Sequence, residues 1–139
     1  MSHEQVARIL SRLDRRTTDR ILAHLEEQES TLAHRIRDNM VLFEDLGKLD
    51  KRGLQTLLQE VTDETLAVAL RGELPELVAR FKGNLSHRRA EELHEALMLA
   101  PPQPRPRVEQ ARREILETAR QLQARGLLIL PSRSEPMID

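Results

Sequence analysis

Histidines and acids are the side chains of this chain with the most obvious chemistry, since it has no cysteine. His87 and His94 lie seven positions apart in a predicted helix, so they share a face. No acid completes a zinc motif of the HExxH type, and the five glycines are too isolated for a phosphate-binding loop. We therefore expect no catalytic residue, no metal site, no cofactor and no enzymatic role.

A stripe of charge is the strongest candidate for binding. Arg88, Glu92 and Glu95 fall on one face of the same predicted helix, and Arg71 ends an earlier helix that could lie near it. A charged stripe of this kind suits contact with another protein. The alternative is an ordinary solvated face, because exposed helices carry mixed charges that pair only weakly.

The elements that position these charges follow a repeat. Related tetrapeptides occur at Leu13–Arg16, Leu49–Arg52 and Leu85–Arg88, and they begin 36 residues apart. Periods of 20–50 residues are typical of stacked helical units, whose joined surfaces usually hold another protein. Each copy ends in arginine, so a shared structural role is the alternative to a binding role for Arg88.

Composition excludes several classes of function. The chain has 139 residues, enough for about one domain, and a formal charge of -1 that gives no general attraction to nucleic acid. It has two phenylalanines and no tryptophan or tyrosine for stacking bases. No apolar run reaches the roughly 20 residues of a membrane span. We expect a cytoplasmic protein that binds no nucleic acid and does not insert into a membrane.

Apolar periodicity predicts helices through most of the chain, and therefore an all-α fold. Four prolines between Ala100 and Arg107 predict an extended linker, because proline lacks the backbone donor. The predicted helices run over Glu4–Leu13, from Thr17 or Thr18, from Ser30, from Asp50, from Asp63 to Gly72, from Pro75, from Ser86, and over Val108–Arg125.

A bulky apolar cluster at residues 40–46 precedes Gly47. Its position between two copies of the repeat suggests a hinge between two helical bundles. Ordinary core packing is the alternative, because apolar clusters usually lie in a core.

Several segments in order resemble the C-terminal part of the flagellar motor switch protein FliG. The resemblance extends over nearly the whole chain, to about Leu130. Its order and spacing are specific, although no single motif is decisive. The segments that carry it are Ala7–Arg15, Ile21–Glu27, Met40–Leu46, Leu49–Arg52, Leu57–Val61, Ala67–Gly72 and Asn84–Arg88.

This resemblance implies an all-α fold with an armadillo-like, right-handed helical superhelix and a C-terminal six-helix bundle domain. The hinge corresponds to the Met-Phe-x-Phe motif of the family, with Val41 in place of the first phenylalanine. The implied parts are an armadillo-like module at 1–39, a hinge of Met40, Val41, Leu42 and Phe43, and a C-terminal helical domain at 44–130. From its terminal position alone, we expect 131–139 to be a flexible tail.

The resemblance also implies a ridge of charges that contacts the stator protein MotA and transmits torque. Two family charges are absent, since Ala96 replaces an acid and Pro104 replaces an arginine. Further implied partners are the switch protein FliM and neighbouring copies of the chain, whose armadillo-like modules stack. The ridge residues carried over to this chain are Arg71, Arg88, Glu95 and the adjacent Arg105.

The resemblance places the chain in the flagellar basal body, at the cytoplasmic face of the inner membrane, with a part in torque and switching. One alternative is a FliG-like scaffold or adaptor that has lost the motor role. Another is the related cytosolic domain of MgtE-type magnesium transporters, which the lack of a membrane segment disfavours. An enzyme is the remaining alternative, and the lack of residue groups with catalytic spacing argues against it.

Overall fold

The computed structural model describes residues 2–131, except for the side chains at positions 4, 15, 38 and 39. Within this range the chain forms eight α-helices and one 3-10 helix, and no strand. The prediction of an all-α fold is confirmed. The elements are α1 (His3–Ser11), α2 (Arg15–Gln28), α3 (Ser30–Asn39), η1 (Phe43–Lys48), α4 (Lys51–Glu60), α5 (Asp63–Ala69), α6 (Pro75–Lys82), α7 (His87–Leu99) and α8 (Arg105–Ala124).

Packing divides the described chain into two compact units, residues 2–42 and residues 43–130. The first unit comprises α1 to α3, and the second comprises η1 and α4 to α8. The boundary falls between Leu42 and Phe43, within the segment predicted as a hinge. Movement about that segment stays a prediction, and residues 132–139 of the predicted tail lie outside the described residues.

The 36-residue repeat marks the starts of three helices. The second residue of each tetrapeptide is the N-cap of α2, α4 or α7, and its side-chain oxygen accepts a hydrogen bond from the backbone N–H three residues later. This satisfies one of the donors that have no partner within the helix. The three bonds join Asp14 to Thr17 at 2.6 Å, Asp50 to Gly53 at 2.7 Å and Ser86 to Arg89 at 3.2 Å.

The prediction that Thr17 or Thr18 caps the second helix was wrong. Asp14 is the cap, and α2 begins at Arg15. The Thr18 side chain is buried and donates to the backbone oxygen of Leu10 in α1 at 2.7 Å. Its hydroxyl is therefore used to join two helices, while the carboxylate earlier in the chain satisfies the helix end.

The proline-rich linker is shorter than predicted. Helix α8 begins at Arg105 rather than Val108, with Pro104 as its N-cap and Pro106 in its first turn. The first turn of a helix tolerates proline, because its N–H groups have no partner within the helix and its fixed φ is already helical. At the other end, Gly126 has a φ of +75°, a conformation that favours glycine, and it follows the helix where the sequence predicts the stop.

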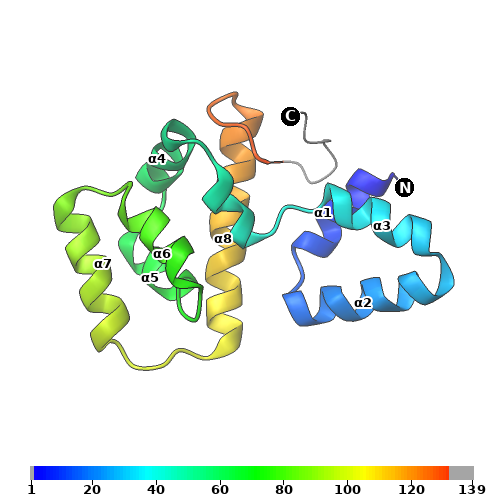
Figure 1. Ribbon diagram of the computed structural model, residues 1–139, viewed down its shortest axis with the longest axis horizontal. Helices are drawn as coiled ribbons and strands as arrows, with labels where there is room; N and C mark the ends of the chain where they lie inside the picture. The colour runs from blue at the N-terminus through cyan, green and yellow to red at the C-terminus, as the bar shows by residue number, and fades with distance from the viewer. Residues whose placement is uncertain (1, 132–139) are drawn as a thin grey trace. The chain divides into compact units, whose positions relative to one another are not determined.

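Helix α7 lies at the outer side of the second unit, with α5 and α6 between it and α8 (Figure 1). Leu93 is its one buried residue, so most of its side chains face solvent. Helix α8 instead buries a full apolar face, and α5 packs against both α7 and α8. No helix within residues 2–131 is long and apolar enough to cross a membrane.

Candidate functional site

The outward face of α7 carries the predicted charged stripe. The Arg88 side chain is 84% exposed, and its Nε lies 3.6 Å from an Oε of Glu92. His87 and Glu91 form a similar exposed pair at 3.0 Å. Glu95 is exposed on the same helix, two turns beyond Arg88. Pairs of this kind contribute only a few tenths of a kcal/mol, so these charges remain available to another molecule.

Arg71 differs from the other proposed ridge residues. It is half-buried, and its guanidinium donates to the backbone oxygens of Ala96 at 3.2 Å, Leu97 at 3.5 Å and Ala100 at 2.9 Å. These carbonyls belong to the end of α7, where the last backbone acceptors lack partners within the helix, although the oxygen of Ala96 also accepts from the N–H of Ala100. Arg71 therefore lies against the same helix as Arg88 and Glu95, but its donors point at the backbone.

The remaining ridge position lies on another helix. Arg105 is the first residue of α8 and is exposed. Pro104, where the resemblance implied an arginine, is the N-cap of this helix and carries no charge. Ala96, where the resemblance implied an acid, offers only its backbone oxygen to Arg71. Of the four residues predicted for the ridge, Arg88, Glu95 and Arg105 are therefore exposed, and Arg71 is half-buried.

Arg89, next to Arg88, was missed by the sequence reasoning. Its guanidinium donates to Asp63 Oδ1 at 2.6 Å and to the backbone oxygens of Leu58 and Val61, both at 3.0 Å. Those two carbonyls lie at the end of α4, so Arg89 joins α7 to the end of α4 and the start of α5. The only sequence signal is that Arg89 lies beside the apolar face of α7.

Two further arginines bind the ends of helical segments in the second unit. Arg80 of α6 donates to the backbone oxygens of Gly47 at 3.3 Å and Leu49 at 2.8 Å, at the end of η1. Arg112 of α8 donates to those of Ala69 at 2.8 Å and Arg71 at 2.7 Å, after α5. Arginine suits this task because its planar fork presents several donors at once.

The four residues of the predicted hinge pack with different units. Met40 is buried in the core of the first unit, and Leu42 packs against that core. Phe43 is buried in the second unit, where its ring meets Phe81 edge to face at 5.9 Å and 70°. Val41 is half-buried. The predicted hinge therefore includes one core anchor for each unit.

Metal and ligand candidates are few. His87 lies against Glu91, and His94 Nδ1 lies 3.3 Å from the ammonium of Lys82, so the two histidines have different neighbours. Among the described residues, no three histidine or acidic side chains gather where they could hold a metal ion.

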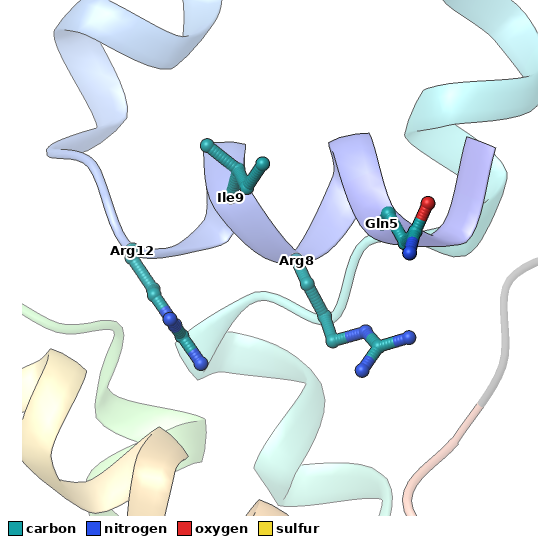
Figure 2. A pocket seen from close by; sticks show the side chains of 4 residues that line it. All are labelled: Gln5, Arg8, Ile9 and Arg12. Carbon is teal, nitrogen blue, oxygen red and sulfur yellow. The ribbon is translucent and has the colours of Figure 1, made fainter. Parts of the chain in front are cut away.

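An open hollow lies along α1 (Figure 2). Its lining residues are Gln5, Arg8, Ile9 and Arg12, and the two arginines extend to the same side of the helix (Figure 2). Gln5 also accepts a hydrogen bond from the backbone N–H of Ser2 at the helix start. None of these residues was predicted as a site from the sequence.

Comparison with known proteins agrees with the fold. The model of the FliG C-terminal domain family matches residues 23–130. The flagellar motor switch protein FliG of Thermotoga maritima is 35% identical over 127 residues, which cover 91% of this chain and 38% of that protein. FliG of Borreliella burgdorferi is 33% identical over 133 residues, which cover 95% of this chain and 38% of that protein. This chain thus spans less than two fifths of the length of these relatives.

Solved structures give the same result. A crystal structure of part of FliG from Helicobacter pylori superposes with a TM-score of 0.73 at 30% identity, covering 92% of this chain and 60% of that one. The structure of full-length FliG from Aquifex aeolicus superposes with a TM-score of 0.62 at 30% identity, covering 91% of this chain and 39% of that one. The family match over most of the chain confirms the resemblance seen in the sequence. The chain belongs to the FliG C-terminal domain family.

Proposed function

We propose that this chain is the C-terminal part of a flagellar rotor protein, and that it transmits torque and takes part in switching through protein–protein contact. The observation that carries the proposal is the exposed charge on α7, where Arg88 and Glu95 face solvent. Charged rims act mainly on association rate and specificity, which suits a contact that must form and release repeatedly. Membership of a family of motor switch proteins supports a non-enzymatic role.

The partner of this face is a MotA-like stator protein with complementary charges. A FliM-like switch protein and neighbouring copies of the chain are the other proposed partners, by analogy with the family. This assembly places the chain at the cytoplasmic face of the inner membrane, in the flagellar basal body. The absent charges at Ala96 and Pro104 leave Arg88, Glu95 and Arg105 to make the stator contact.

Complementation tests this function. A flagellated bacterium lacking its own FliG would receive a chimera in which this chain replaces the matching C-terminal region, scored for filament assembly and rotation. We expect both, with Arg88→Glu abolishing most rotation while filaments still form. Replacing an acidic residue of the stator loop by a basic one should restore rotation in cells that carry the Arg88→Glu chimera. Filaments that never rotate, with any stator, would contradict torque transmission and favour an adaptor role.

The first unit supports the proposed contact between copies. Ile9 in α1 and Leu13, just after the end of that helix, are exposed at 48% and 39%. Helical arrays whose edges lack a polar cap tend to associate. Sedimentation velocity at high micromolar concentration should therefore show self-association that Ile9→Glu weakens, whereas Ile129→Glu in the second unit should not. A monomer at all concentrations would contradict this contact.

A further inference from the structure

We propose that Arg71 is a positioning residue, which holds the end of α7 in place rather than contacting the partner itself. The family places a ridge charge here, but the side chain in this chain is turned onto backbone. Its guanidinium donates to Ala96 and Ala100 at 3.2 and 2.9 Å, with a longer bond to Leu97.

Arg112 holds Arg71 from the other side. It donates to the backbone oxygen of Arg71 at 2.7 Å, and its side chain is only 19% exposed. Glu73 lies 3.2 Å from the same guanidinium and balances its charge. The backbone at position 71 is therefore fixed by α8, while the side chain at the same position fixes α7.

The same guanidinium also reaches the beginning of the second unit. The Cζ of Arg112 lies 5.6 Å from the centre of the Phe43 ring, within the range of a cation–π contact. A continuous path therefore leads from Phe43 through Arg112 and Arg71 to the end of α7. By this path, Phe43, the last residue of the predicted hinge, is connected to the helix that carries Arg88 and Glu95.

A charge-only role and a positioning role predict different results for lysine and glutamine. A ridge charge at position 71 would survive Arg71→Lys and be lost in Arg71→Gln. A positioning role needs the fork of donors, which neither lysine nor glutamine reproduces. Both substitutions should therefore have similar effects, although only one of them removes the charge.

Hydrogen–deuterium exchange of the whole chain is the primary test and needs no partner. In both variants, amides at residues 97–100 should exchange about tenfold faster, the factor expected for losing one hydrogen bond from a charged group. Arg88→Gln is the matched control and should leave these amides unchanged. Unchanged exchange at 97–100 in Arg71→Gln would overturn the proposal. If this variant loses global stability, Arg71→Lys decides by the same criterion.

Binding to a peptide of the charged cytoplasmic loop of a MotA-type stator gives the second readout, which rests on the proposed function. We expect both Arg71 variants to bind several-fold more weakly. Lysine binding like the parent while glutamine fails would show a charge contact and overturn the positioning role. If no peptide binds even to the parent chain, the stator contact fails, while the exchange result still decides the role of Arg71.

Discussion

The Nε of Arg89 lies 2.6 Å from Oδ1 of Asp63, and this pair joins the start of α7 to the start of α5. Its neighbour Arg88 makes one long contact within its own helix. The two arginines are adjacent and chemically identical, yet Arg89 is 24% exposed and Arg88 is 84% exposed. They therefore form a matched pair for separating structural charge from surface charge.

Truncating Arg89 should destabilise the second unit. Arg89→Ala removes bonds to two backbone carbonyls and a half-exposed carboxylate, and we expect a loss of about 2 to 3 kcal/mol after allowing for solvent. Arg88→Ala should change stability by less than about 0.5 kcal/mol. Urea unfolding followed by circular dichroism measures both, because the chain lacks tryptophan and tyrosine. Equal losses of unfolding free energy in the two variants would contradict a structural role for Arg89 and a surface role for Arg88.

Reversing the exposed charge should affect binding and leave folding nearly unchanged. Arg88→Glu should melt close to the parent, since exposed charges contribute little to stability. It should also weaken binding to the stator loop and alter its dependence on salt. Arg52→Glu is the control, because Arg52 is the corresponding exposed residue of the previous repeat. Large and similar losses of melting temperature in both variants would favour a structural role for the repeated arginine.

The helix caps shared by the repeat should each be worth a measurable amount. Asp50→Ala should cost about 1 kcal/mol, or about 4 to 8 °C in melting temperature for a unit of this size. Asp50→Asn is the conservative control, because asparagine caps equally well. The Asp50 carboxylate also packs closely against Gly53, since a Cβ at that position would lie 2.9 Å from the Asp50 oxygen. A melt in which alanine and asparagine behave alike would contradict the capping role.

Met40 and Phe43, the buried residues on either side of the unit boundary, should each stabilise a different unit. Phe43→Ala should destabilise residues 43–130 by about 3 to 5 kcal/mol, because it removes a buried ring and its contact with Phe81. Met40→Ala should lower the free energy of unfolding of residues 2–42 by about 2 to 5 kcal/mol. Hydrogen–deuterium exchange resolves the two effects by region. Loss of protection throughout the chain in either variant would show that the units unfold together.

The orientation of the two units should vary about residues 40–43. The chain has no cysteine, so spin labels at His24→Cys and Gln59→Cys would be unique. Both positions are exposed, one in α2 and one in α4. We expect a broad distance distribution for this pair, and a narrow one for labels at Gln59 and Glu91 within the second unit. One narrow distance for the first pair in all conditions would contradict a mobile hinge.

Local features of this protein could be read from its sequence because they depend on neighbours a few residues apart. Helical periodicity, the caps at Asp50 and Ser86, and the stop at Gly126 are of this kind. The errors at α2 and α8 were also local, and they concern which of several nearby residues caps the helix. The charged stripe on α7 follows from spacing within one helix.

Only the tertiary structure decided which charges remain on the surface. Helical spacing places Arg89 beside the apolar face of α7, but its partners come from the end of α4, about 30 positions earlier, and only packing brings them within its reach. Arg71 likewise meets carbonyls 25 to 29 positions later, at the end of α7. An arginine can either bind a helix end or face solvent, and the choice depends on which helix end packing brings within its reach. The sequence by itself determined the helices and their charged face, and long-range packing determined which arginines hold them together.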